Sequence, residues 1–151
     1  MRTPPERTGW LANGDSLDMH HEVIRNLLDG ALYRAPVQNP RHILDVGTGT
    51  GIWAIDVADK HPAAAVLGTD LSPIQPHWLP ANCTFEIADA AAPWAFAQQF
   101  DLVHVRNLGN SLSDYPALAA AAFNSMHVDG YIELSEGGGA CPAPIRLAIP
   151  R

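Results

Sequence analysis

Apolar and polar positions alternate along this chain with two different periods. Runs of branched or aromatic residues bounded by turn residues predict strands over residues 43–46, 65–70, 83–87, 100–106 and 131–134. Apolar positions at helical spacing predict helices that begin at Ser16, at Ile52 and at Ser113 or Asp114. Because strands alternate with helices, the pattern predicts an α/β fold with a mostly parallel sheet.

The same pattern divides the chain into three parts. Residues 1–38 hold a polar arm and one amphipathic helix, and residues 39–136 hold all the predicted strands. Residues 137–151 read GGGACPAPIRLAIPR and show no periodicity, so we expect this tail to be disordered or docked on a partner.

The link between the first strand and the following helix is rich in glycine. Asp45 lies near the end of the strand, and Gly47, Gly49 and Gly51 alternate with threonines in HILDVGTGTGI. Glycine permits positive φ and a close backbone approach, and the N–H groups at a helix start attract an anion. We therefore expect a nucleotide-like ligand, with a βα turn of an unrelated α/β protein as the alternative. The spacing differs from the G-x-G-x-x-G of NAD sites.

Acidic residues follow the next two strands. Asp70 ends the second strand about twenty positions after Gly47, where an acid in a Rossmann-like unit binds ribose hydroxyls. The alternative is a helix cap or a turn carboxylate. Asp89 follows the third strand, and its position predicts a contact with the exocyclic amine of an adenine.

Polar side chains also end the fourth strand and mark the first helix. His104, Arg106 and Asn107 lie where open parallel sheets bind ligands, beyond the carboxyl ends of the strands. His104 is either a general base or a hydrogen-bonded structural histidine. His21 and Arg25 lie on the first helix, which either covers the pocket as a lid or packs plainly with a solvated polar face.

Composition narrows the possible partners. The formal net charge is −7 and no Lys/Arg cluster is present, so a nucleic-acid partner is disfavoured. No apolar run reaches the length that spans a membrane. Cys83 and Cys141 are not in metal-ligand spacing, so we expect no metal site and a cytoplasmic or nuclear protein with reduced thiols.

Five segments together carry a family resemblance. They are LDMHHEVIRNLLDGALYRAPV (17–37), NPRHILDVGTGTGIWAIDVADKHP (39–62), LGTDLSPIQPHWLP (67–80), NCTFEIADAAAPW (82–94) and FDLVHVRNLGNSLSDYP (100–116). With them the chain resembles the LaeA-like methyltransferases of filamentous fungi, a branch of the class I S-adenosylmethionine (SAM) methyltransferases. The resemblance covers Leu17 to Glu136, and GTGTGIWAID followed by GTDLSPIQP is its most specific part.

The resemblance implies a fold, a cofactor and a site. The fold is a Rossmann-like class I three-layer sandwich, here without the usual C-terminal strands, and the cofactor is SAM. The residues implied to bind SAM are Asp45, Gly47, Gly49 and Gly51 at the methionine end, Asp70 at the ribose, and Asp89 with Ala90 at the adenine; Thr48 and Leu71 are further cofactor-binding candidates. His21 and Arg25 match a helix that family members place over the pocket. Trp53 and Asn107 are further candidates on the substrate side, and His104 and Arg106, from the end of the fourth strand, are the catalytic candidates.

The chain also departs from the family pattern. Ala88, Ala91 and Ala92 replace acidic residues around Asp89, Asn110-Ser111 replaces Gly-Ser, and His127-Val128-Asp129-Gly130 replaces Lys-Pro-Gly-Gly. The strands that normally follow the fifth one are absent from the pattern. An uncovered fifth strand would be a liability in water, so we expect a homodimer or hetero-complex through that edge.

Three functions follow from this pattern. The first is a SAM-dependent methyltransferase that acts on a small molecule or a protein in fungal secondary metabolism. The second is a truncated pseudo-methyltransferase that serves as a regulatory or binding subunit. The third is a methyltransferase fold recruited for isomerisation or cyclisation of a metabolite, with His21, Arg25 or His104 polarising the substrate.

Overall fold

The computed structural model describes residues 15–136 and 145–150, and the rest of the predicted arm and tail lies outside them. The elements are α1 Asp15–Leu27, β1 His42–Val46, α2 Ile52–Lys60, β2 Ala65–Asp70, β3 Cys83–Ile87, β4 Phe100–Arg106, the 3₁₀ turn η1 Gly109–Ser111, α3 Tyr115–Ser125, β5 Met126–Glu136 and β6 Ile145–Pro150. The strands and helices that the apolar pattern predicted all form at the expected places.

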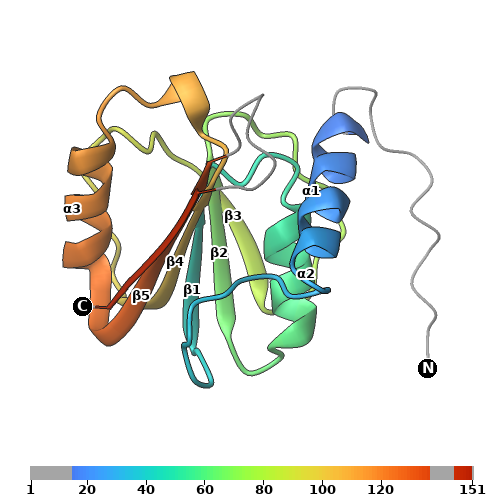
Figure 1. Cartoon of the computed structure of the whole chain (residues 1–151), viewed down its shortest axis with the longest axis horizontal. Coiled ribbons are helices and arrows are strands. Elements are labelled where there is room, and N and C mark those ends of the chain that lie inside the picture. The colour runs from blue at the N-terminus through green and yellow to red at the C-terminus, as the bar shows by residue number, and fades with distance from the viewer. Residues whose placement is uncertain (1–14, 137–144, 151) are drawn as a thin grey trace.

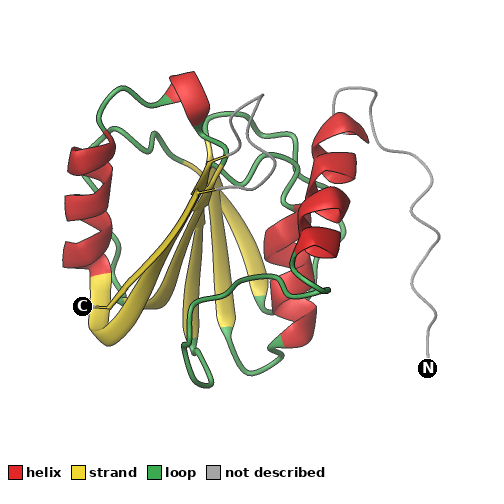
Figure 2. Cartoon of the chain, viewed as in Figure 1, coloured by secondary structure: helices red, strands yellow, loops and turns green. Residues whose placement is uncertain are grey.

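The sheet has the order β3-β2-β1-β4-β5-β6. Its first five strands by sequence pair in parallel, and β6 is antiparallel to β5. Figures 1 and 2 show α1 and α2 on one face of the sheet and α3 on the other. The prediction of a three-layer α/β sandwich with a mostly parallel sheet is therefore confirmed.

Strand residues alternate between two apolar cores, one on each face of the sheet. On the α2 face, Trp53 packs with Ile43 and Leu102, and all three are almost fully buried. On the α3 face, Val103 packs with Leu118. Each such buried side chain contributes about 1.5–3 kcal/mol to folding. Asp45 and His104 follow Ile43 and Leu102 by two residues on the same strands, so they too face α2.

The tail contains a sixth strand that the sequence analysis missed. β6 pairs with β5 from Tyr131 opposite Pro150 to Glu136 opposite Ile145. The prediction of a tail without regular structure is therefore wrong for residues 145–150, and so is a sheet that ends at β5. The signal was the alternation in IRLAI, which the preceding glycines and prolines obscured. Because β6 covers β5, the predicted assembly through an exposed fifth strand loses its basis.

A bulge interrupts the pairing at the start of β5. Asp129 has φ 66°, and the register with β4 shifts between Phe100 and Leu102. A Cβ at Gly130 would lie 2.9 Å from the carbonyl oxygens of His127 and Phe100, so only glycine fits where the chain bends. The strand therefore begins at Met126, before the expected Tyr131.

The helices are short. α1 has 13 residues and ends at Leu27, and Gly30 follows with φ 82° and donates its N–H to the carbonyl of Arg25 at 2.8 Å. In the part of the chain that the structure describes, no helix is both long and apolar enough to cross a membrane. The segment after α1 crosses the sheet to the start of β1, and α1 lies beside α2 (Figure 1).

Candidate active site

The glycine loop after β1 adopts the backbone that its sequence predicted. Gly47, Gly49 and Gly51 have φ values of 70°, 59° and 79°, which favour glycine. The N–H groups of Gly47 and Thr48 donate to the carbonyl oxygen of Thr69 at 2.8 and 2.9 Å. These bonds tie the loop to β2 and leave its other side toward α1 and the end of β4.

Two of these glycines are also required by close neighbours. A Cβ at Gly51 would overlap the ring of Phe85, and a Cβ at Gly47 would overlap the side chain of Leu108. Phe85 also lies 2.5 Å from where a Cβ on Gly68 of β2 would be. The glycine loop therefore packs against Phe85 of β3 and against Leu108 in the segment after β4.

Asp70 joins the end of β2 to the glycine loop. Its Oδ2 accepts the N–H of Gly49 at 2.8 Å, and its Oδ1 accepts the N–H of Ser72 at 2.9 Å. A carboxylate offers about four acceptor sites, so two of them are left for ligand hydroxyls. Gln75 holds the opposite side of the loop, because its amide donates to the carbonyl of Gly49 at 2.6 Å.

A buried acid–imidazole pair lies beside the loop. The Nδ1–H of His104 donates to Oδ1 of Asp45 at 2.7 Å, and the Thr48 hydroxyl donates to Oδ2 of the same carboxylate at 2.6 Å. The His104 ring stacks on Trp53 with centroids 3.6 Å apart and planes 5° from parallel. Asp45 and His104 expose only 3% and 2% of their surface. The pair fixes the tautomer and the plane of the imidazole, and Nε2 is the nitrogen left to exchange a proton.

The environment of His104 favours the neutral imidazole. Burial lowers its pKa below the ordinary 6.5, and the nearby Arg106 lowers it too, whereas the hydrogen bond and charge of Asp45 and the charge of Glu133 oppose that shift. With the folded-state pKa below the unfolded one, the contribution of this group to stability is present above pH 6.5 and is lost as pH falls below it. At neutral pH, Nε2 is therefore available as a proton acceptor.

A cavity of about 90 Å³ connects these groups. Among the predicted site residues, those that line it are Asp45, Gly47, Thr48, Gly49, Trp53, His104, Arg106 and Asn107. Gly51, Asp70, Leu71, Asp89 and Ala90 do not line it. The structure thus brings the predicted catalytic residues together with the predicted methionine-end residues except Gly51, and the predicted ribose and adenine residues lie outside this cavity.

The predicted adenine side is an open surface. Asp89 is exposed, and its Oδ1 accepts the N–H of Ala91 at 2.9 Å. Leu71 and Ile87 are 66% and 69% exposed at the adjacent ends of β2 and β3, where Asp70 pairs with Ile87. Ala90 packs instead against the apolar core of the α3 face.

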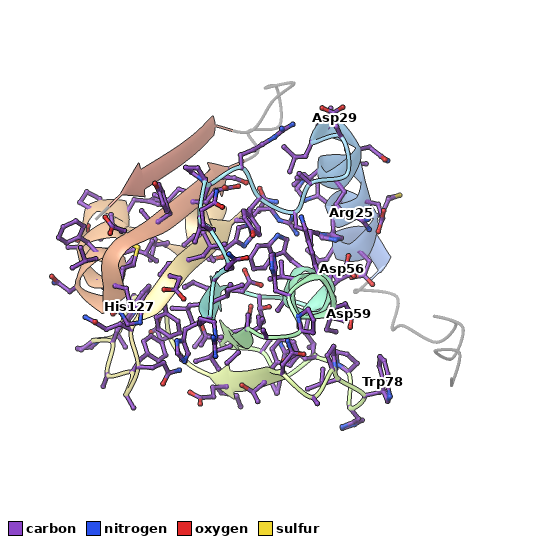
Figure 3. The ribbon with its side chains drawn as sticks, turned by 90° about the horizontal axis from the view of Figure 1, so that it is seen from below. Arg25, Asp29, Asp56, Asp59, Trp78 and His127 are labelled. Atoms are coloured by element: carbon purple, nitrogen blue, oxygen red, sulfur yellow. The ribbon has the colours of Figure 1, made fainter. Side chains whose placement is uncertain are left out.

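Helix α1 is bound to the core through polar side chains. His21 is fully buried, its Nε2–H donates to Asp56 of α2 at 3.0 Å, and its Nδ1 accepts from Arg106 at 3.0 Å. Arg25 also reaches Asp56, at 3.4 Å, between α1 and α2 (Figure 3). The predicted substrate residues His21 and Arg25 therefore hold the helix down and do not line the cavity.

Other α1 residues meet the cavity directly. His20 and Leu17 line it, and the amide of Asn107 donates to His20 at 3.0 Å. Asp18 accepts from the Thr50 hydroxyl at 2.7 Å. Sequence analysis missed these contacts because helical periodicity alone does not show which polar residue of the turn faces the glycine loop.

One group of possible metal ligands occurs among the described residues. It consists of His21, Glu22 and Asp56. Arg25 lies 3.2 Å from Glu22 and 3.4 Å from Asp56, so a cation already balances both carboxylates. We assign this group to the docking of α1.

The segment after β4 is fixed by Glu136 at the end of β5. Its carboxylate accepts the N–H groups of Leu108 and Gly109 at 3.0 and 3.1 Å and the hydroxyl of Tyr115 at 2.7 Å. Desolvation and this bond to Glu136 raise the pKa of Tyr115 to about 12. Leu108 is thereby held against Gly47.

A larger hollow lies away from this chemistry. It measures about 480 Å³ and is lined by Trp94, Phe96, Ala97, Gln98, Gln99, Ala121, Asn124 and Ser125. None of these side chains titrates near neutral pH, and Trp94 donates its ring N–H to the carbonyl of Ala90. Trp78 is 61% exposed and stands at the periphery (Figure 3). The smaller cavity therefore remains the candidate site.

Comparison with known proteins assigns the family. Residues 19–148 match a family described as a methyltransferase domain. This chain belongs to the methyltransferase domain family. The glycine loop, Asp70 and the Asp45–His104 pair all lie inside the matched segment. S-adenosyl-L-methionine is the cofactor of this family, as the sequence motifs predicted.

Relatives in filamentous fungi refine the assignment. Methyltransferase pytC of Aspergillus terreus is 43% identical over 125 residues, which are 81% of this chain and 38% of that protein. Secondary metabolism regulator laeA of Monascus pilosus is 41% identical over 126 residues, 81% of this chain and 34% of that protein. Protein-methionine methyltransferase laeA of Emericella nidulans is 38% identical and is covered to 33%. The chain is LaeA-like and spans about a third of these relatives.

Solved structures confirm the class I fold. The plantazolicin methyltransferase BpumL in complex with SAH matches 64% of this chain and is covered to 39%, with a TM-score of 0.58 and 20% identity. Coclaurine N-methyltransferase bound to N-methylheliamine and SAH matches 88% of this chain and is covered to 39%, with a TM-score of 0.61 and 22% identity. At these identities the likeness shows the fold alone.

Proposed function

We propose that this chain binds SAM and transfers its methyl group to an O–H or N–H acceptor, a small molecule or a protein, in fungal secondary metabolism. The observation that carries the proposal is the buried Asp45–His104 pair on the same cavity as the glycine loop. The loop and the relatives support SAM binding. The pair supports an acceptor that has a proton to lose.

The residues present fit the cofactor. The positive-φ glycines turn the backbone into a tight loop, and Gly47 and Gly49 of this loop line the cavity beside Asp45. Asp70 keeps acceptor sites for ribose hydroxyls, and the exposed Leu71 and Ile87 offer apolar surface to a nucleobase. The 90 Å³ cavity is the innermost part of this proposed site, at the methionine end.

His104 would act on the acceptor's proton. When bound, SAM supplies an electrophilic methyl group on a sulfonium. Nε2 of His104 takes the proton that the acceptor's oxygen or nitrogen gives up, and Asp45 stabilises the imidazolium through Nδ1–H. Trp53 stacks on the ring and excludes water from one face. A thioether acceptor, such as a methionine side chain, has no such proton and would not need this pair.

Asp70→Ala tests the cofactor site. We expect the affinity for SAM and for S-adenosylhomocysteine to fall roughly 10- to 150-fold, because a charged hydrogen-bond acceptor contributes about 1.5–3 kcal/mol. Asp70→Asn keeps the shape and one acceptor oxygen, so its loss is smaller. The measurement is isothermal titration into the 151-residue protein.

Asp59→Ala is the matched control, because Asp59 is exposed and lies near the carboxyl end of α2, whereas the glycine loop precedes the amino end of that helix. Equal affinities in all four proteins would refute the ribose assignment. Binding without methyl transfer to any acceptor would favour the pseudo-methyltransferase function. Turnover of a metabolite without SAM would favour isomerisation or cyclisation.

A further inference from the structure

Three titratable side chains form one row across the centre of the sheet. Asp45 of β1 pairs in register with His104 of β4, and His104 pairs with Glu133 of β5. All three are at most 3% exposed. They share the α2 face, because the row two residues earlier, Ile43, Leu102 and Tyr131, belongs to the core on that face. An imidazole thus stands between two buried carboxylates.

Glu133 also binds the segment that leads from α1 to β1. Its Oε2 accepts the N–H groups of Arg34 and Ala35, both at 2.7 Å. In the same region, the ring N–H of Trp53 donates to the carbonyl of Leu32 at 2.8 Å. A buried carboxylate needs such donors, since burial without them is strongly unfavourable. The one carboxylate therefore touches the backbone behind α1 and faces the imidazole of the candidate base.

The groups that surround His104 come from five elements. Asp45 of β1 and Glu133 of β5 are the anions that act on it, and Arg106 of its own strand is the cation. α2 contributes the uncharged ring of Trp53, and α1 contributes His20, which lines the same cavity. With Asp45 already hydrogen-bonded to Nδ1, Glu133 is the second anion that favours a proton on this ring.

We propose that Glu133 is a positioning residue for the proton-accepting histidine: its charge supports the protonated form of His104, and its two backbone hydrogen bonds tie that charge to the segment before β1. The proposal rests on the proposed function in one respect only, which is that His104 takes its proton from the methyl acceptor. The proton moves from the acceptor to Nε2 and later to solvent. The electrostatic coupling between Glu133 and His104 exists in the ligand-free protein.

The test is an NMR titration of His104 in the ligand-free 151-residue protein and in Glu133→Gln. The amide side chain keeps the size of the group and one acceptor oxygen but removes the charge. We expect His104 to bind a proton about three- to tenfold more weakly in Glu133→Gln, because a nearby opposite charge favours the charged form. Glu136→Gln, on the same strand and bonded to the segment after β4, is the matched control and leaves the titration unchanged.

A second readout needs no variant. In the wild-type protein, the backbone amides of Arg34 and Ala35 follow the titration of His104 with the same midpoint, because both contact the carboxylate that responds to the new charge. An unchanged His104 titration in folded Glu133→Gln overturns the proposal. The proposal is also overturned if the amide signals of Arg34 and Ala35 do not change at the midpoint of the His104 titration. It is overturned as well if His104 stays neutral down to the pH at which the protein unfolds.

Failure of this coupling and failure of the proposed function are distinguishable. SAM binding and methyl transfer with an unaffected His104 titration would refute only the role of Glu133. The expected titration without SAM binding would leave the buried row intact as a property of the fold and refute the methyltransferase function. A Glu133→Gln protein that is merely less stable, with the wild-type titration, would assign Glu133 a structural role alone.

Discussion

Replacing Gly51 by alanine lowers the free energy of unfolding by about 2–5 kcal/mol. About 1–2 kcal/mol comes from the left-handed backbone, since φ is 79° and a Cβ is unfavourable there. A further 1–3 kcal/mol or so comes from overpacking, because the new methyl group would overlap the Phe85 ring at the base of the loop. Chemical denaturation of both proteins measures the difference.

Two other glycines allow the cost of the left-handed backbone to be measured without the steric conflict at Phe85. Gly30 has φ 82° with nothing within 4 Å of the position that a Cβ would take, and Gly49 has φ 59° with only Leu17 at 3.5 Å. Alanine at either position should cost about 1–2 kcal/mol, from the backbone alone. Phe85→Leu should restore part of the stability lost in Gly51→Ala. If Gly51→Ala costs no more than Gly30→Ala, then the Phe85 contact does not restrict the loop.

The second large effect concerns methyl transfer. His104→Asn should lower the rate with an O–H or N–H acceptor roughly 10²- to 10⁴-fold, the usual contribution of a general base. The affinity for SAM should change less than the rate, since the proton that His104 takes belongs to the acceptor and not to SAM. The measurement is single-turnover methyl transfer together with isothermal titration of SAM.

Its control is His127→Asn, because His127 lies at the amino end of β5, remote from the loop (Figure 3). With a thioether acceptor, His104→Asn should transfer the methyl group at nearly the wild-type rate, since no proton is removed. The wild-type rate with an O–H acceptor should fall only below pH 6.5, because burial lowers the pKa of His104. A wild-type rate in His104→Asn with every acceptor would contradict the assignment of the base.

Local patterns predicted most of the fold and part of the site. The loop from β1 to α2 is encoded within one short segment, so the glycines and their positive φ could be predicted from sequence. Asp70 could be predicted for the same reason, since the length of one βαβ unit fixes its distance from Gly47. The Asp45 and His104 positions were predicted singly, and the structure added that they form one hydrogen-bonded pair.

Long-range contacts could not be predicted in this way. Glu133 meets Arg34 and Ala35 across 99 and 98 residues of chain, and nothing in the local sequence of β5 marks that contact. The sequence analysis placed His21 on a possible lid over the pocket. The direction of its side chain, however, depends on how α1 packs against α2, which the local sequence does not show. β6 was missed for a different reason, because glycine and proline before it masked a short alternating run.

The strand order has a consequence for how the protein folds. β1, β2 and β3 run in chain order from the centre of the sheet to one edge, and β4, β5 and β6 run from the centre to the other. Within the sheet, the two halves meet where β1 pairs with β4, and Asp45 and His104 are 59 residues apart in sequence. Pairing β1 with β4 closes a longer loop of chain than pairing within either half and therefore costs more entropy. We therefore expect the β1–β4 pairing to form late in folding. The acid and the imidazole come together in that step, and a half-folded chain therefore lacks the Asp45–His104 pair altogether.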